Sequence, residues 1–206
     1  MKKLLLIVTI IIFIILLNFR FYVFNVGYYK EELSKIGVSN EFSEKEITEN
    51  LNQLVSYIKN NQPLTTSFFN EKEKQHLIDV KNLIDKTIFI FYLSLMLLII
   101  FLYLNKKDLK KPLLYSGISL ILIPIFLSLI NFNFIFIKFH EIFFTNDLWL
   151  LNPETDNLIK LFPKQFFINF TKKILINSLI IGIILVICSF FLKPKSSLKI
   201  FSIFHK

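Results

Sequence analysis

Two histidines stand out as groups whose type and position could carry a reaction. His140 precedes Glu141 directly, and His76 lies three residues before Asp79. Imidazole titrates near neutral pH, so a histidine can take up or release a proton during a reaction. The alternative is that each is a hydrogen-bonded residue at an interface, because histidine is intermediate in burial. On residue type and position alone, both interpretations of the pair stay open.

Other reaction centres find less support in the sequence. The His140-Glu141 pair lacks the second histidine of an HExxH motif, so we predict no metal site. No GxSxG elbow accompanies any serine, and neither GxGxxG nor GxxxxGK[ST] occurs. The single cysteine, Cys188, excludes a disulfide within the chain and a cysteine-based zinc site. We therefore predict no cofactor, and a metal-dependent lipid hydrolase remains an alternative.

The elements that must position the histidines are mostly membrane helices. Of the 206 residues 54% are hydrophobic, and only 19% are charged against about 25% in ordinary soluble domains. A membrane-spanning helix needs about 20 mainly apolar residues. Stretches of this kind predict four transmembrane helices, over residues 1–24, 87–104, 112–130 and 174–192. The first stretch offers no small residues for signal cleavage, so we expect an uncleaved anchor.

Charge predicts the orientation of these spans. Ten lysines and Asp108 alone fall in the N-terminal segment, the 105–111 loop and the 193–206 tail, while the other two connections carry as many basic as acidic residues. The positive-inside rule then places both termini and the 105–111 loop in the cytoplasm. The lysines flank spans without interleaved aromatic residues, so we predict no nucleic-acid partner.

The two long connections, 25–86 and 131–173, are expected outside the cell. Ser43 with Glu46, and Asn70 with Glu73, are spaced as capping boxes that begin helices. The first of these helices has an apolar stripe at helical spacing, formed by Ile47, Leu51, Leu54, Val55 and Ile58. The second helix, from Glu71, is expected to run directly into the second span, because Gly and Pro are absent between 64 and 111.

The second outer segment is unusually aromatic. It places six Phe residues between 132 and 144, and aromatic side chains are well suited to the level of the lipid headgroups. We expect this segment to lie on or partly in the outer leaflet. Asn152-Pro153 is typical of a helix start, and Phe162-Pro163 is expected to end that helix. The predicted fold is thus an all-α membrane protein, with a mainly helical extracytoplasmic cap and a cleft open to the outer leaflet.

Three stretches of the sequence resemble the lipoprotein intramolecular transacylase (Lit) family of bacterial integral membrane proteins. They are FHEIFFTNDLWLLNPETDNLI at 139–159, LFPKQFF at 161–167 and EKQHLIDVK at 73–81. The resemblance implies an acyl transfer from the sn-2 oxygen of a lipoprotein's diacylglyceryl cysteine to its α-amine. It also implies that the family's two motif histidines fall on His76 and His140.

Further expectations about the site accompany this resemblance. His76 and His140 would be a general acid and a general base, with Asp79 or Glu141 orienting a histidine. Asp147 and Trp149 would shape the pocket for the lipid head. The partners would be a diacylated lipoprotein and membrane lipids, at the outer side of the cell membrane. The alternative is a non-catalytic membrane module that binds an envelope lipoprotein or lipid, for which the two histidines would lie far apart.

Overall fold

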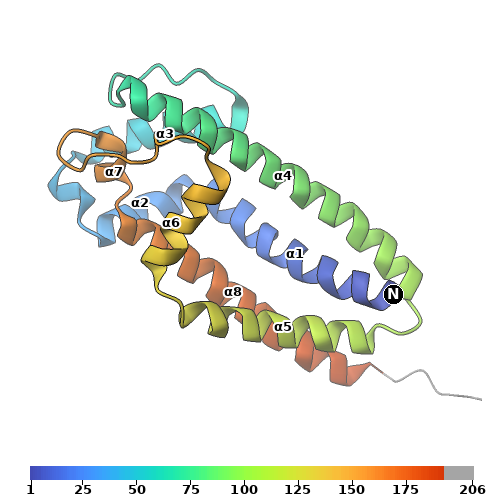
Figure 1. Cartoon of the computed structure of the whole chain (residues 1–206). Helices are drawn as coiled ribbons and strands as arrows, with labels where there is room; N and C mark the ends of the chain where they lie inside the picture. Colours follow the sequence, from blue (N-terminus) through green and yellow to red (C-terminus); the bar gives the residue numbers. More distant parts are fainter. Residues whose placement is uncertain (193–206) are drawn as a thin grey trace, which may run out of the picture.

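The computed structural model describes residues 1–192, and within that part of the chain all regular structure is helical (Figure 1). The predicted all-α fold is therefore confirmed. The tail 193–206, with its four lysines and His205, lies outside the described residues. In chain order the helices are α1 (Lys2–Val23), α2 (Val26–Lys35), the 3-10 turn η1 (Val38–Asn40), α3 (Glu44–Asn60), α4 (Glu71–Asn105), α5 (Lys110–Ser128), α6 (Phe132–Phe143), α7 (Asn157–Leu161) and α8 (Lys164–Phe191).

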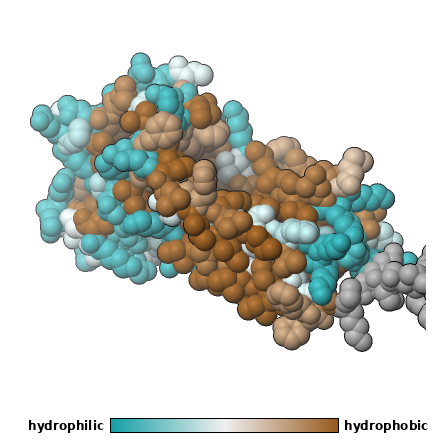
Figure 2. All heavy atoms as spheres, turned by 60° about the horizontal axis from the view of Figure 1, so that its bottom comes forward, coloured by the Kyte–Doolittle hydropathy of each residue, from teal (hydrophilic) through white to brown (hydrophobic). Residues whose placement is uncertain are grey.

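Four of these helices, α1, α4, α5 and α8, are long and apolar enough to cross a membrane. Most of their apolar side chains face outward, and Figure 2 shows a brown hydrophobic band with polar atoms gathered at its two ends. Outward-facing apolar side chains of this extent are what lipid requires of a spanning helix. The prediction of four membrane helices is confirmed.

The other three long helices pack around α1. It contacts α4 on one side and α5 and α8 on the other, and α5 and α8 lie against each other along their length (Figure 1). The α5–α8 contact is close because glycines face each other. A Cβ atom added at Gly117 would come within 2.7 Å of the Gly182 carbonyl oxygen, and one added at Gly182 within 2.8 Å of the Gly117 oxygen. Small residues allow membrane helices to approach in this way.

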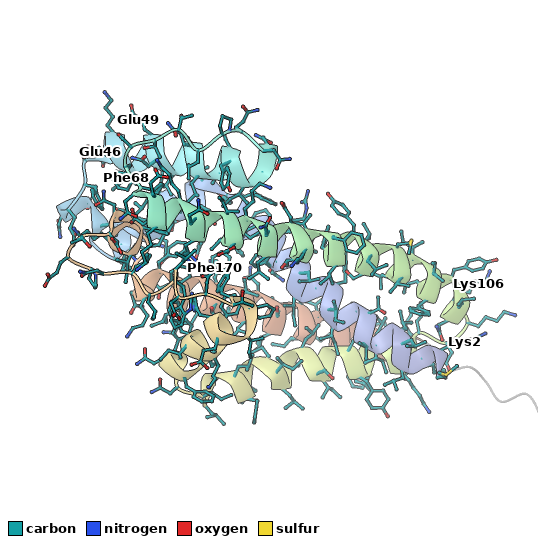
Figure 3. The ribbon with its side chains drawn as sticks, turned by 45° about the horizontal axis from the view of Figure 1, so that its top comes forward. Lys2, Glu46, Glu49, Phe68, Lys106 and Phe170 are labelled. Atoms are coloured by element: carbon teal, nitrogen blue, oxygen red, sulfur yellow. The ribbon has the colours of Figure 1, made fainter. Side chains whose placement is uncertain are left out.

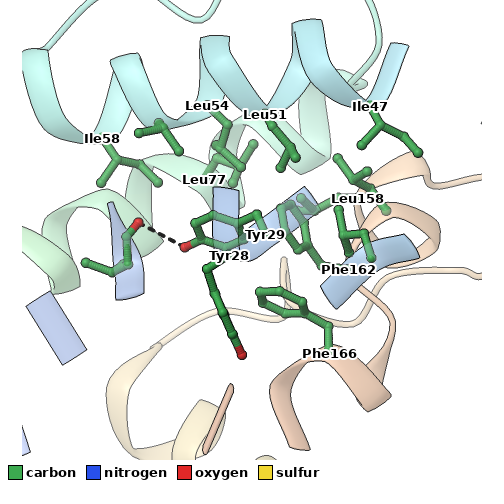
Figure 4. Packing of buried hydrophobic residues seen from close by; sticks show 14 of the residues in the cluster. Tyr28, Tyr29, Ile47, Leu51, Leu54, Ile58, Leu77, Leu158, Phe162 and Phe166 are labelled. Atoms are coloured by element: carbon green, nitrogen blue, oxygen red, sulfur yellow. Dashed lines mark hydrogen bonds between the residues drawn. The ribbon is translucent and has the colours of Figure 1, made fainter. Parts of the chain in front are cut away.

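A helical cap covers one end of the bundle. It consists of α2, η1, α3 and α7 with the adjoining ends of α4 and α8, and it has its own apolar core (Figure 4). The predicted stripe of α3 is buried there, and Leu33, Leu51 and Leu161 are fully enclosed. Tyr29 ties the cap to the first span, because its hydroxyl donates a 2.9 Å hydrogen bond to the Val23 carbonyl oxygen.

Both predicted capping boxes form. Ser43 and Glu46 begin α3, and Asn70 and Glu73 begin α4. Within each pair, the side chain of each residue accepts a hydrogen bond from the backbone N–H of the other residue. From Glu71 the α4 helix continues unbroken for 35 residues to Asn105, so the expected passage from cap to span is also confirmed. One rigid element therefore connects the cap to the far end of the bundle.

The segment after α6 departs from the expected structure. Asn152-Pro153 does not begin a helix; residues 152–156 form a turn, and α7 starts at Asn157 with Asp156 as its N-cap. The turn forms in place of a helix because its side chains accept hydrogen bonds from nearby backbone N–H groups. Asn152 accepts from the Glu154 N–H, and Asp156 accepts from the Asn152 N–H. Helix α7 does end at Leu161, just before Phe162-Pro163, as predicted.

The end of the bundle opposite the cap holds the first residues and the α4–α5 turn. Figure 3 shows Lys2 and Lys106 there, with Glu46 and Glu49 at the cap end. Lys3 forms an ion pair with Asp108, which joins the start of α1 to that turn. The lysine-rich segments among the described residues therefore lie together, at the greatest distance from the cap.

Candidate active site

Two helices from distant parts of the chain bring His76 and His140 together. His76 lies in the second turn of α4, and His140 lies in the last turn of α6. Their ring centroids are 6.4 Å apart, with the ring planes inclined by 30°. The fold therefore places the two imidazoles side by side, although 64 residues separate them in the chain.

His140 is held on three sides. Its Nδ1 lies 2.7 Å from the Phe136 carbonyl oxygen, one helical turn earlier. A carbonyl oxygen only accepts, so we assign Nδ1 as the N–H donor, and Nε2 then has the lone pair of the neutral ring. The Phe136 ring packs at 4.3 Å and the Trp149 ring at 4.8 Å, centroid to centroid. The imidazole is thus fixed in orientation and tautomer, with its basic nitrogen known.

His76 is more enclosed and less satisfied. The side chain is 7% exposed, and the Phe144 ring lies against it at 5.2 Å, edge to face. Its Nδ1 is buried and has no hydrogen-bond partner within residues 1–192. A buried polar atom left unpaired costs about 1–3 kcal/mol, and such atoms are rare in native proteins. A free-energy cost of this kind is typical of a functional site.

Burial keeps both imidazoles neutral. It lowers the pKa of His76 to about 4; the neighbouring His140 and Lys72 lower it too, against the opposing effect of Asp79. The pKa of His140 is also below its ordinary value, because burial outweighs the favourable hydrogen bond to the Phe136 carbonyl. At neutral pH each ring therefore has one N–H donor and one lone pair.

The four other predicted site residues are placed differently. Asp79 accepts a 2.9 Å hydrogen bond from the Asn146 amide, and its charge reaches His76. Glu141 points to the exposed side of α6 and pairs with Lys138, away from either imidazole. Asp147 is exposed and accepts the Leu150 N–H through its backbone carbonyl. Trp149 is the one of the four that packs on a histidine ring.

The expected cleft is closed at the histidines. His76 is 7% and His140 9% exposed, and two hollows in the described residues are lined by other side chains. Each has a volume of about 390 Å³; one lies beside the end of α3, and the other between η1 and the start of α8. The side chains of Phe144 and Trp149 lie against the two rings, so the expected cleft does not open at the histidines in this structure.

The described residues offer no metal site. In the range 1–192 no three His, Cys, Asp or Glu side chains converge in the way that a bound ion needs. The chemistry that the histidine pair can supply by itself is proton transfer and hydrogen-bond donation.

Sequence reasoning missed Phe136, Phe144, Asn146 and Lys72. Phe136 and Phe144 lie four residues before and after His140, the spacing of neighbours on one helix face. Treating 132–143 as a helix would have identified Phe136. Asn146 contacts Asp79, and Lys72 donates to the Leu150 carbonyl at 2.6 Å. No local pattern announces these two contacts, because each joins segments more than 60 residues apart.

Comparison with known proteins shows the family and the fold. Residues 4–167, about four-fifths of the chain, match the model of the family described as lipoprotein intramolecular transacylase Lit. The fold is similar to the in meso structure of the membrane-integral lipoprotein intramolecular transacylase Lit from Bacillus cereus. The identity is 28% and the TM-score 0.82, covering 92% of this chain and 93% of that one.

Two further structures of the Bacillus cereus protein each carry one substituted histidine. In one a histidine is replaced by arginine, with TM-score 0.78 and coverage of 92% of this chain and 89% of that one. In the other a histidine is replaced by alanine, with TM-score 0.79 and coverage of 93% and 91%. Both are 28% identical to this chain. A search of curated proteins finds no match.

Proposed function

This chain belongs to the lipoprotein intramolecular transacylase family, as a multi-pass membrane protein, and on that premise we propose which acyl chain it moves and how. The substrate is a lipoprotein whose N-terminal cysteine carries a diacylglyceryl thioether. The enzyme transfers the sn-2 acyl chain to the cysteine α-amine. One amide bond forms and one ester bond breaks within a single molecule, and the product is the lyso-form lipoprotein.

The observation that carries this proposal is the pair of imidazoles, 6.4 Å apart and neutral at physiological pH. Donor ester and acceptor amine belong to the same substrate, so the enzyme needs no nucleophile of its own and no second substrate. What the reaction needs is orientation of the two groups and movement of one proton. Positioning and general acid–base catalysis supply these, and the latter contributes about 10²–10⁴-fold.

We assign the proton to His140. The Phe136 carbonyl engages Nδ1, so Nε2 is the nitrogen available as a base. It accepts the proton of the amine as the nitrogen attacks the ester carbonyl carbon. The resulting imidazolium then gives the same proton to the departing sn-2 oxygen. The ring ends the cycle neutral, as it began.

We assign His76 to the ester carbonyl oxygen. With a pKa of about 4 the ring does not hold a second proton at neutral pH, which disfavours it as the acid. A neutral imidazole can still donate a hydrogen bond. The buried Nδ1 of His76 has no partner within residues 1–192, so we assign it as the atom that bonds the substrate. Donation to the oxygen stabilises the negative charge that develops there in the transition state.

The reaction is proposed to occur at the outer leaflet. His76 lies near the start of α4, and His140 near the end of α6, both at the cap end of the bundle. The opposite end holds the lysine-rich segments that the positive-inside rule assigns to the cytoplasm. The exposed apolar side chains of α6, which include Phe134, Phe139 and Ile142, suit the level of the lipid headgroups. A lipoprotein anchored in that leaflet would present its glyceryl head at this height.

The alternative, a binding module without catalysis, is disfavoured by the same geometry. It requires no convergence of the histidines and gives no reason for an unpaired buried imidazole nitrogen. Two enclosed neutral imidazoles with complementary free atoms are what an acid–base reaction needs. We therefore retain the transacylase reaction as the proposed function.

The test is co-expression with a reporter lipoprotein, followed by tandem mass spectrometry of its N-terminal peptide. Substrate and product are isomers, so the peptide mass does not change. Fragmentation instead reports the acyl chain on nitrogen, and loss of amine labelling reports the same change. We expect the native chain to convert the reporter, and His76→Gln and His140→Gln each to lower the rate at least 100-fold.

His205→Gln serves as the matched control, since the sequence indicates no role for that histidine. It is expected to convert the reporter at the native rate. Equal membrane abundance of the variants, measured by immunoblot, separates lost chemistry from lost protein. Conversion retained by both His76→Gln and His140→Gln contradicts the assigned roles, whereas an unconverted reporter with the native chain contradicts the reaction.

A further inference from the structure

One segment covers both histidines. We call residues 144–156, the connection between α6 and α7, the strap; in Figure 1 it is the orange loop between those helices. Phe144 of the strap lies on His76, and Trp149 lies on His140. The two imidazoles are 7% and 9% exposed beneath it. A lipid head needs contact with both rings, so the strap must move before substrate can bind.

The far half of the strap is fastened by buried carboxylates. Asp156 is 5% exposed and accepts hydrogen bonds from the Asn70 amide and the Asn152 N–H. Glu73, 1% exposed, accepts the Leu158 N–H just beyond the strap. Breaking these bonds would leave carboxylate oxygens unpaired inside the protein, which is costly. This half therefore stays attached to the start of α4.

The near half is fastened by bonds in contact with water. The Asn146 amide donates to Asp79 at 2.9 Å, and Lys72 donates to the Leu150 carbonyl at 2.6 Å. Both bonds are exposed, so water can replace either partner when they separate. Thr145, Asn146, Asp147 and Leu150 are themselves exposed. The apolar packing under this half comes mainly from Phe144 and Trp149 on the histidines and from Leu151, next to the turn, on the cap core.

We propose that residues 144–151 are a gate, which turns on the fixed 152–156 turn and exposes the histidine pair to a lipoprotein's lipid head. Asp79, Asn146 and Lys72 are the positioning residues that hold the gate closed. The function of the gate rests on the proposed transacylase reaction. Its position in the chain rests on the difference between the exposed bonds of residues 144–151 and the buried bonds of residues 152–156. The closed gate keeps water from the imidazoles, and opening admits the substrate.

The gate carries its own reporter, because Trp149 is the only tryptophan of the chain. In detergent-solubilised protein, quenching of its fluorescence by acrylamide measures how far it is uncovered. Asn146→Asp sets two carboxylates against each other and is expected to raise the quenching constant at least twofold. Asp79→Asn combined with Asn146→Asp restores the hydrogen bond with donor and acceptor exchanged, and is expected to restore native quenching.

Lys72→Met tests the gate through a different bond, since it removes the donor to the Leu150 carbonyl oxygen. It also removes a charge that lowers the pKa of His76 and of Asp156. Its matched control is Lys74→Met, which loses an ion pair with Glu71 and no contact with the strap. We expect increased quenching for the first variant and native quenching for the second. Native quenching in both Asn146→Asp and Lys72→Met overturns the gate, and so does failure of the exchanged pair to restore it.

Locking the gate tests its purpose. Asp79→Cys with Asn146→Cys, in a Cys188→Ser background, is bridged by a short thiol-specific linker that reductant cleaves. Bridging is verified by mass spectrometry of the joined peptides. We expect conversion of a diacylated lipopeptide to fall at least tenfold on bridging and to recover on reduction. Lys45→Cys with Glu49→Cys, bridged in the same way on the exposed face of α3, is expected to leave the rate unchanged.

The outcomes separate the two proposals. A bridged enzyme that turns over at its own unbridged rate overturns the gate, with the reaction intact. A native chain that converts no lipopeptide overturns the reaction, and the quenching series then still decides whether residues 144–151 open.

Discussion

At the scale of single residues, the different roles proposed for the two histidines follow from their surroundings. His140 has one nitrogen occupied by a backbone carbonyl, whereas the Nδ1 of His76 has no partner within residues 1–192. Burial lowers both pKa values, and that of His76 lies near 4. A group whose charged form is disfavoured in the folded state also links stability to pH.

The linkage predicts that acid destabilises the protein through His76. The pKa is lower folded than unfolded, so its contribution is present above about pH 6.5 and is lost as pH falls toward 4. The shift corresponds to about 3 kcal/mol in total. We expect the unfolding temperature to fall several degrees more between pH 7 and 4.5 in the native chain than in His76→Gln, by differential scanning fluorimetry. Parallel curves for the two proteins are the contrary result.

From the sequence, the candidate site residues could be selected more easily than the residues that surround them. The two histidines and Trp149 could be selected from residue type and motif resemblance, and the structure brings these three together. Glu141 was selected because it adjoins His140, yet consecutive helical residues point in different directions, and Glu141 pairs with Lys138. Phe144 and Lys72 act across long sequence separations, which no local pattern encodes.

At the scale of elements, the local signals that proved correct were those with a backbone mechanism. Each capping box satisfies N–H groups that a helix start leaves free, so Ser43 and Asn70 mark the true beginnings of α3 and α4. Asn152-Pro153 is also typical of a helix start, but the Asp156 carboxylate accepts from the Asn152 N–H and a turn forms there instead. A competing bond of this kind depends on a side chain four residues further along, so the dipeptide Asn152-Pro153 by itself does not predict it.

The crossing of α5 and α8 gives a prediction at this scale. Gly117→Ala and Gly182→Ala each place a methyl group against a backbone carbonyl, which cannot move aside as a side chain can. The helices must separate, at a cost of about 1–3 kcal/mol, partly offset by the better helix propensity of alanine. We expect a lower unfolding temperature for both variants.

Gly27→Ala is the matched control for this crossing. Its added Cβ would meet only the Asn25 side chain, at 3.3 Å, so we expect an unfolding temperature within about a degree of native. Native stability in Gly117→Ala and Gly182→Ala would show that the crossing tolerates a wider spacing than the structure has.

At the scale of the whole molecule, the distribution of lysines and the fold are consistent with one orientation in the membrane. The lysines at the start of α1 and in the α4–α5 turn share one end of the bundle, and the cap and histidines share the other. Hydropathy was sufficient to find four spans, but not the outer extent of the last one. The α8 helix begins at Lys164, ten residues before the predicted span, because its first turns pack into the cap through Phe166.

The orientation predicts a labelling pattern in intact cells. With Cys188→Ser as the background, we expect a membrane-impermeant maleimide to label Glu49→Cys on α3 from outside. Lys106→Cys, at the opposite end, is expected to react only after the membrane is permeabilised. The physical reason is that a charged reagent does not cross the hydrocarbon core. The reverse pattern would place the histidines on the cytoplasmic side.

The unbroken α4 helix has a consequence for the enzyme in membranes of different lipid length. Its 35 residues measure about 52 Å, well beyond the roughly 30 Å of a bilayer's hydrocarbon core. A thicker or thinner bilayer is accommodated by a change in the tilt of such a rod. Because His76 stands about 16 Å above the Thr87 end of the apolar stretch, along the same rod, any change of tilt shifts its height against the headgroups. If His76 acts as proposed, the length of the membrane's fatty acids would thereby affect how well its imidazole reaches the ester carbonyl.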